Sequence, residues 1–83
     1  MSYERIRAAK KRAVGTRETT KAVQKGLARV VFVARDAEAH VTEPLLSLCR
    51  EKGIEVIMVD SMRELGRACG IEVSSASAAI LEE

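Results

Sequence analysis

Two continuous runs of apolar, mostly β-branched residues place the strongest constraint on how this chain can fold. The first, ARVVFVARD, covers residues 28–36, and the second, IEVIMVD, covers residues 54–60. Neither run alternates between apolar and polar positions, which is typical of strands that are buried on both faces of a sheet. Other elements must cover both faces, so the sequence predicts an α/β sandwich with right-handed crossover connections.

Glycines and capping residues divide the rest of the chain into helices and a last strand. The four predicted helices cover residues 3–14, 17–25, 42–53 and 62–70. The expected N-caps of the last three are Thr16, Thr42 and either Asp60 or Ser61. The glycines that can end the helices are Gly15, Gly26, Gly53 and Gly70. Pro44 would lie in the first turn of the third helix, and residues 75–83 would supply a last short strand.

The tetrapeptide GIEV occurs twice, at residues 53–56 and 70–73. In both copies the glycine can stop the preceding helix. The first copy runs into IMVD and is predicted to begin a strand. The second runs into SSAS, which packs poorly, so we expect a loop there.

Length and composition exclude several classes of protein. Eighty-three residues suffice for one domain only, residues 1–83. The chain has 31% charged residues and no apolar run near the roughly 20 residues of a spanning helix, which argues against a membrane protein. The N-terminal segment lacks the apolar core of a secretory signal, so we expect a cytoplasmic protein.

The two cysteines and the one histidine predict no metal or redox site. Cys49 and Cys69 lie twenty positions apart, with only His40 to help, whereas such sites need closer clusters. We therefore expect buried structural thiols, no metal and no cofactor.

The charge is divided along the chain. Residues 1–29 hold nine cations and two acids, a net charge of +7, whereas residues 30–83 hold five cations and ten acids, a net charge of −5. This asymmetry suggests a polyanionic partner on one face. The alternative is a solvated helix surface. The basic first helix, with Lys10, Lys11 and Arg12, either flanks such a partner or only keeps the protein soluble.

The second predicted helix carries the most specific signal. Arg17, Lys21 and Lys25 form a cationic stripe at i, i+4 and i+8. The start of the helix adds unpaired N–H groups, which suit phosphate oxygens and base acceptors. Glu18 would repel phosphates but can accept from base amino or imino groups. The alternative is that Glu18 only favours the helix N-terminus and pairs with Lys21.

Aromatic residues are nearly absent, since the chain has only Tyr3 and Phe32. This argues against domains that stack single-stranded bases on aromatic side chains. An RNA ligand should therefore be structured and distorted from a plain duplex, because the A-form major groove is too narrow for a helix end.

Four segments resemble, in order, those of the L7Ae ribosomal protein family of kink-turn RNA binders. They are GTRETTKAV, RVVFVARDA, EPLLSLCREKGI and MRELGRACGIEVSSASAAI. The resemblance covers roughly residues 14–81, and the short length is similar to that of the bacterial members. It implies a three-layer α/β/α sandwich with a small mixed four-stranded sheet. It also implies binding to kink-turns, in which tandem sheared G·A pairs bend an RNA helix sharply.

The resemblance also implies which residues bind RNA. They are Gly15, Thr16, Arg17, Glu18, Thr20, Lys21, Arg67, Ile71, Glu72 and Val73. In the family, the turn at Gly15 and the start of the second helix enter the widened groove, where Glu18 and Lys21 read the bases. Arg17 stands where members commonly carry Asn and is longer, charged and bidentate. Ile71 to Val73 form the apolar loop that rests on an unstacked nucleotide, and Arg67 adds a phosphate contact.

The leading hypothesis is a monomeric, non-enzymatic module that recognises and stabilises kink-turns in structured RNA. Ribosomal RNA and riboswitch RNA are the candidate partners, and no membrane is involved. A second hypothesis is a magnesium-dependent phosphoryl-transfer or receiver-like domain using Asp36 and Asp60, which follow the two apolar runs. The favoured alternative is that these acids cap the turns and helices that follow. A third is a protein-interaction adaptor using the acidic C-terminal half.

Overall fold

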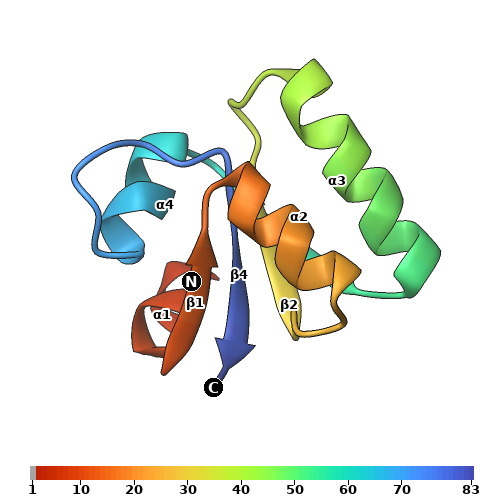
Figure 1. The fold of residues 1–83 in the computed structure, drawn as a ribbon. Helices are drawn as coiled ribbons and strands as arrows, with labels where there is room; N and C mark the ends of the chain where they lie inside the picture. Colours follow the sequence, from red (N-terminus) through yellow and green to blue (C-terminus); the bar gives the residue numbers. More distant parts are fainter. Residues whose placement is uncertain (1) are drawn as a thin grey trace.

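The computed structural model of the chain describes residues 2–83, in which helices and strands alternate from one end to the other (Figure 1). The elements are α1 (Ser2–Ala8), β1 (Lys11–Val14), α2 (Thr16–Gln24), β2 (Val30–Ala34), α3 (Ala39–Lys52), β3 (Glu55–Val59), α4 (Met62–Ala68) and β4 (Ser77–Glu82). The strands form one mixed sheet in the order β1-β4-β2-β3. β2 and β3 run parallel, whereas β4 is antiparallel to both β1 and β2.

Two helices cover each face of this sheet. α2 and α3 lie on one face, and α1 and α4 lie on the other (Figure 1). A cluster of buried apolar side chains fills the space on each side. The predicted three-layer α/β/α sandwich with a small mixed four-stranded sheet is therefore confirmed.

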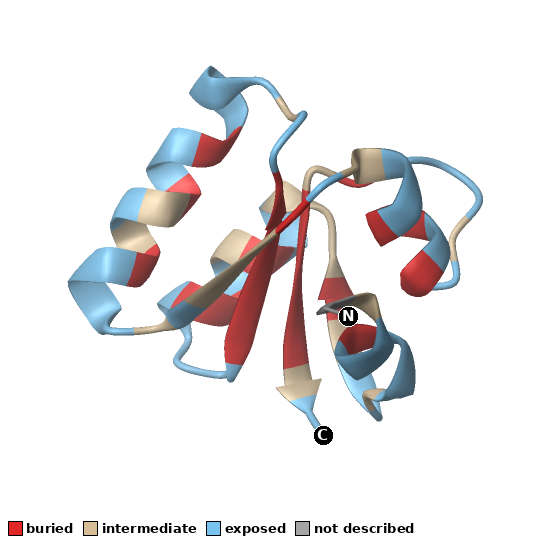
Figure 2. Cartoon of the chain, turned by 180° about the vertical axis from the view of Figure 1, so that it is seen from behind, coloured by how far each residue is buried: buried red, intermediate tan, exposed pale blue. Residues whose placement is uncertain are grey.

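β2 contributes to both clusters. Val30, Phe32 and Ala34 pack on the side of α1 and α4, and Val31 and Val33 pack under α2 and α3. All five residues are buried, and the buried positions gather in the sheet while the outer faces of the helices stay exposed (Figure 2). Each fully buried valine stabilises the fold by roughly 1.5–3 kcal/mol relative to an exposed one. The predicted strand with two buried faces is confirmed.

β3 differs from β2 because it lies at the edge of the sheet. Glu55 is exposed and the next three residues are half-buried. The prediction of a strand is confirmed, but the prediction that both faces of this strand are buried is wrong. A continuous apolar run predicts a strand without fixing its place in the sheet.

The first predicted helix, residues 3–14, is wrong in its second half. α1 ends at Ala8, and residues 11–14 form β1, which pairs with β4. Arg12 Nη1 donates to the carbonyl oxygens of Ile6 (2.9 Å), Arg7 (3.0 Å) and Ala9 (3.4 Å). The Arg12 guanidinium thereby satisfies carbonyls at the end of α1. Pairing with β4 overrides the helical pattern of residues 11–14, because strand formation depends on the neighbouring strand.

α3 begins at Ala39, earlier than the predicted start at Thr42. Glu38 is its N-cap, so Thr42 does not cap the helix but is buried within it. Pro44 lies in the second turn rather than the first. Proline lacks an N–H group, so the helix loses one backbone hydrogen bond to its exposed first turn, where water can replace it.

The two cysteines are buried on opposite sides of the sheet. Cys49 belongs to the cluster under α2 and α3, and Cys69 to the cluster under α1 and α4. Burial raises the pKa of the Cys49 thiol. Burial also raises the pKa of the Cys69 thiol, although the charge of Arg12 partly opposes this shift. Both residues therefore pack as neutral apolar side chains, which confirms the predicted buried thiols.

None of the helices in residues 2–83 has the length and apolar character needed to cross a membrane. No group of three or more potential ligand side chains in that range could hold a metal ion.

Candidate nucleic-acid interface

α2 begins at a turn that only glycine adopts readily. Gly15 has φ 93° and ψ 154°, where a side chain would be strained. Its N–H donates to the carbonyl oxygen of Ser77 (2.9 Å), and its own carbonyl accepts from the N–H of Thr19 (2.9 Å). Gly15 is therefore the N-cap of α2, and the prediction that Thr16 caps this helix is wrong.

Thr16 is instead the first residue of α2 and points its hydroxyl to β4. Thr16 Oγ1 and Ser77 Oγ share a hydrogen bond of 2.8 Å. Over the described residues, no side chain caps the start of α2. The first N–H groups of the helix and the positive end of its dipole thus remain available to an acceptor from another molecule.

The charged residues after Thr16 lie on the surface. Arg17, Glu18, Lys21 and Lys25 are all exposed. Lys21 Nζ lies 3.9 Å from Glu18 Oε2. The Lys21 side chain is 49% exposed and the Glu18 side chain is 61% exposed. The pair between Glu18 and Lys21, which the sequence offered as the alternative to base recognition, is confirmed. An ion pair so open to solvent is weak, so both groups remain accessible to a ligand.

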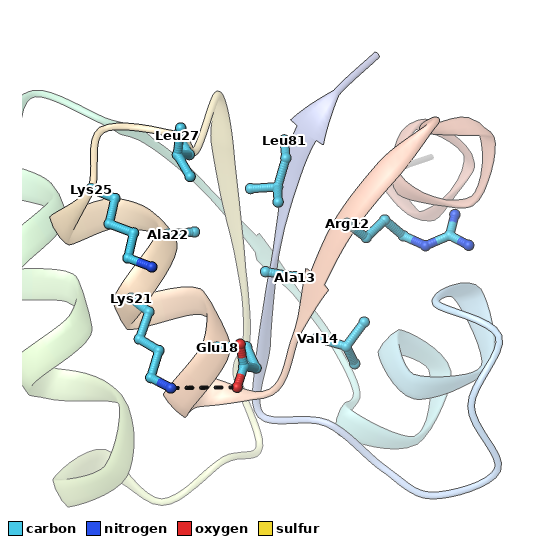
Figure 3. Close-up of a pocket in the computed structure, with 9 residues that line it drawn as sticks. All are labelled: Arg12, Ala13, Val14, Glu18, Lys21, Ala22, Lys25, Leu27 and Leu81. Carbon is cyan, nitrogen blue, oxygen red and sulfur yellow. Dashed lines mark ion pairs between the residues drawn. The ribbon is translucent and has the colours of Figure 1, made fainter.

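A groove of about 330 Å³ runs beside α2, between that helix and strands β1 and β4 (Figure 3). Glu18, Lys21 and Lys25 line it from the helix, and Leu27 and Leu81 line it near the other end. The Arg12 guanidinium points away from the groove, towards α1 (Figure 3). The groove thus has cations and a carboxylate along one wall.

The second GIEV copy forms a loop after α4, as predicted. Val73 is 70% exposed, Ile71 is half-buried and Glu72 is exposed. The loop folds back against Gly66, where an added Cβ would collide with the Val73 carbonyl oxygen. Gly66 was missed in the sequence, where a glycine inside a predicted helix was the available signal.

Buried hydroxyl groups join this loop to the start of α2. Ser75 Oγ donates to the Ser77 carbonyl oxygen (2.7 Å), which also accepts from the Gly15 N–H. The N–H of Ser75 donates to the carbonyl oxygen of Met62 on α4 (3.0 Å). Ser75 and Ser77 are both buried. The loop and the α2 turn are therefore held at the same end of the molecule (Figure 1).

Sequence reasoning did not assign Ser75 or Ser77 a role. Their partners lie up to 62 positions away in the chain, the separation of Gly15 and Ser77, and no local pattern encodes bonds of that kind. The run SSAS, an unusual stretch of small polar residues before a strand, was the signal in the sequence.

The remaining predicted site residues are Thr20 and Arg67, which lie on α2 and α4. Thr20 is half-buried on α2. Arg67 is exposed on α4, and its Nη1 lies 3.7 Å from Glu64 Oε2. Thr19 is fully buried, and Thr19 Oγ1 has no hydrogen-bond partner among residues 2–83.

The two aspartates of the alternative hypothesis have structural partners. Asp36 Oδ1 accepts from the N–H of Met62 (2.9 Å) at the start of α4. Asp60 Oδ1 lies 3.9 Å from Arg35 Nε, and its side chain is 85% exposed. Ser61 is the N-cap of α4 and accepts from the N–H of Glu64 (3.1 Å). This arrangement favours the interpretation of Asp36 as a capping residue.

Comparison with known proteins finds relatives over the whole described chain. The sequence model of the ribosomal protein L7Ae/L30e/S12e/Gadd45 family matches residues 2–83. An RNA-binding protein of Bacillus pumilus (strain SAFR-032) is 41% identical over 81 residues, which are 98% of this chain and 99% of that protein. The large ribosomal subunit protein eL8 of Halobacterium salinarum is 50% identical over 68 residues, which are 81% of this chain and 57% of that protein.

A solved structure has the same fold. The 15.5kD RNA binding protein of Giardia lamblia superposes with a TM-score of 0.85 and 28% sequence identity, over 98% of this chain and 68% of that one. Sequence and fold therefore agree with the resemblance carried by the four segments. The chain belongs to the ribosomal protein L7Ae/L30e/S12e/Gadd45 family.

Proposed function

We propose that this protein binds structured RNA and recognises kink-turns through the start of α2 and the loop at residues 71–73. One observation carries the proposal. The start of α2 has no side-chain cap and exposes Glu18 and Lys21, and the hydrogen bonds of Ser77 to Gly15, Thr16 and Ser75 hold it at the same end of the molecule as that loop. Membership of the family supports it, as do relatives named RNA-binding proteins.

The start of α2 would supply both affinity and base recognition. Arg17, Lys21 and the first N–H groups of the helix attract phosphate and base acceptors. Glu18 accepts from the amino or imino groups that sheared G·A pairs leave facing the groove. A carboxylate repels phosphate, so its place among cations favours base readout over indiscriminate backbone binding.

The loop would supply an apolar contact. Val73 is 70% exposed and Ile71 is half-buried, so these two side chains together offer a small apolar platform. A nucleotide that leaves its stack at the bend exposes an apolar face that can rest there. Arg67, exposed on α4, would then contact a neighbouring phosphate.

We further propose that binding is not coupled to catalysis. The protein would bias a flexible RNA towards its bent form because it has higher affinity for that form. We propose ribosomal or riboswitch RNA in the cytoplasm as the target, and a monomer as the binding species.

The double variant Glu18→Ala/Lys21→Ala tests the assigned surface. We expect it to lose about 1–3 kcal/mol of binding to a kink-turn RNA, or about 5- to 150-fold in Kd, while its thermal unfolding stays close to wild type. Both side chains are exposed, so their removal leaves no cavity. Gel-shift titration gives the affinity.

The matched control is Glu51→Ala/Lys52→Ala, which removes one acid and one base from exposed positions of α3. It should bind like wild type. Wild-type affinity in the Glu18 and Lys21 variant would refute the assigned surface. Equal wild-type affinity for an RNA whose G·A pairs are converted to Watson–Crick pairs would reduce the protein to a nonspecific polycation.

A further inference from the structure

The groove beside α2 continues past the end of that helix. A second hollow of about 220 Å³ shares Leu27 and Leu81 with the first one. Its other lining residues are Lys11, Arg29 and Glu82. The two hollows therefore form one path, which begins at Glu18 near the start of α2 and reaches the opposite end of the sheet.

Cations line this path along its length. Lys21 lies on α2 and Lys25 is the C-cap of that helix, about 6 Å further along the helix axis, and Arg29 and Lys11 continue the row. All four are exposed. Two carboxylates, Glu18 and Glu82, oppose them.

Strand pairing and a hydrogen bond position the two distal cations. Arg29 Nε donates to the Leu81 carbonyl oxygen (3.3 Å), which holds the guanidinium beside β4 and uses only one of its five N–H donors. Lys11 is the cross-strand partner of Glu82 in the pairing of β1 with β4. This placement depends on Lys11 belonging to β1, whereas in a helix over residues 3–14 it would not have faced β4.

The two lining residues that the hollows share are apolar. Leu27 is 55% exposed, and Leu81 is half-buried. Apolar side chains beside a row of cations suit a sugar–phosphate backbone, whose riboses present C–H groups and whose phosphates carry regularly spaced charge. Contacts of this kind carry no sequence information, but they fix the position of a stem.

We propose that this groove binds the backbone of an RNA stem that leaves the kink, so that Lys11, Lys25 and Arg29 extend the interface beyond the start of α2. The inference rests on the proposed function. The groove begins at the residues assigned to base readout, so a bound RNA already lies at its mouth. This continuity favours RNA over an acidic protein segment as the occupant.

The test uses the full chain and two sets of kink-turn RNAs that share the same bend. In one set both stems are as short as folding allows, and in the other each stem in turn is longer by one helical turn. The variant is Lys11→Ala/Arg29→Ala, with Lys11→Ala/Lys25→Ala as a second variant that keeps the Arg29 hydrogen bond. The matched control, Arg50→Ala/Lys52→Ala, removes the same charge from exposed positions of α3.

We expect both variants to bind one long-stem RNA roughly 5- to 50-fold more weakly than wild type at low salt, and the short-stem RNA nearly as well as wild type. The slope of log K against log salt for that long-stem RNA is negative, and its magnitude should decrease by about 2, because two phosphate contacts are lost. The control should leave the slope unchanged.

Two outcomes would overturn the inference. One is wild-type binding of every long-stem RNA by both variants, which would assign the groove to another ligand such as an acidic protein segment. The other is an equal loss for short and long stems, which would reflect overall charge. Failure of the proposed function is seen separately, because wild-type protein would then not distinguish a kink-turn from its Watson–Crick counterpart.

Discussion

The tetrapeptide GIEV occurs at residues 53–56 and 70–73, and the two copies begin alike but end differently. Each glycine has a positive φ, 69° at Gly53 and 81° at Gly70. In each copy the isoleucine N–H donates to the carbonyl five residues earlier, Ile54 to Cys49 (2.9 Å) and Ile71 to Gly66 (3.1 Å). Both helices therefore end in the same hydrogen-bonded motif, which the local sequence determines.

The copies diverge only after the isoleucine. Residue 56 pairs with Val31 in the parallel ladder of β2 and β3, because the edge of β2 is open to it. Among residues 2–83, Val73 has no strand partner, because it lies before the start of β4 at Ser77, and its carbonyl lies against Gly66 instead. The same four residues thus give a strand or a loop according to the surface that they meet.

The largest effect is expected for Gly66→Ala, which attacks the contact that shapes the second copy. The added Cβ would collide with the Val73 backbone, so the loop must move. We expect a loss of about 1–3 kcal/mol in the free energy of unfolding, near the upper end of that range, together with weaker kink-turn binding. Urea denaturation measures the first effect and gel shift the second. Gly26→Ala is the reference for backbone strain alone, because Gly26 has φ 73° and an added Cβ there meets no atom of residues 2–83 within 4 Å; it should cost only about 1 kcal/mol. Equal destabilisation by both changes would contradict the assignment.

A polar residue in the first copy should also destabilise the fold. Val56 is half-buried and packs against the cluster under α2 and α3. We expect Val56→Ser to lower the free energy of unfolding by about 1–2 kcal/mol, because part of an apolar side chain leaves the core. Urea denaturation checks this value. No change would mean that β3 contributes little to that cluster.

The shared helix end predicts matched effects at the two glycines. Gly53→Ala and Gly70→Ala each place a Cβ in the left-handed region and should each cost about 1 kcal/mol. The added methyl meets nothing within 4 Å at either position, so backbone strain alone is measured. Thermal unfolding of the two variants side by side provides the test. Clearly unequal losses would show that the two helix ends are not energetically alike.

The smallest effect on stability is expected for Val73→Ser. This side chain is 70% exposed, so the free energy of unfolding should change by less than about 0.5 kcal/mol. Kink-turn affinity should nevertheless fall, because the proposed apolar platform is reduced. Calorimetry and gel shift on the same sample separate the two effects. A stability loss as large as that of Val56→Ser would remove the contrast between the two copies.

Features that depend on residues close in sequence were predicted well. The glycine stops at Gly53 and Gly70 and the buried run of β2 follow from local chemistry. The loop at residues 71–73 was predicted only from the SSAS that follows it, because GIEV itself gives either a strand or a loop. β1 could not be predicted, because residues 11–14 become a strand only by pairing with β4. The edge position of β3 likewise depends on the strand order.

In the candidate site, too, the features set by local sequence could be predicted and those set by distant residues could not. The exposed charges on α2 could be read from their spacing, and the pair between Glu18 and Lys21 is confirmed. The bonds that position them could not, because Ser77 is distant in sequence from both Gly15 and Thr16. The contacts of these residues with RNA remain predictions.

The hydroxyl pair between Thr16 and Ser77 has one more consequence. It adds a side-chain link to the pairing of β1 with β4 and to the hydrogen bond from the Gly15 N–H to the Ser77 carbonyl oxygen, so the start of α2 does not need to be immobilised when a partner arrives. The loss of conformational entropy on complex formation then lies mainly with the nucleic acid. We expect the protein to keep its conformation on binding, while the RNA bends to fit the protein surface.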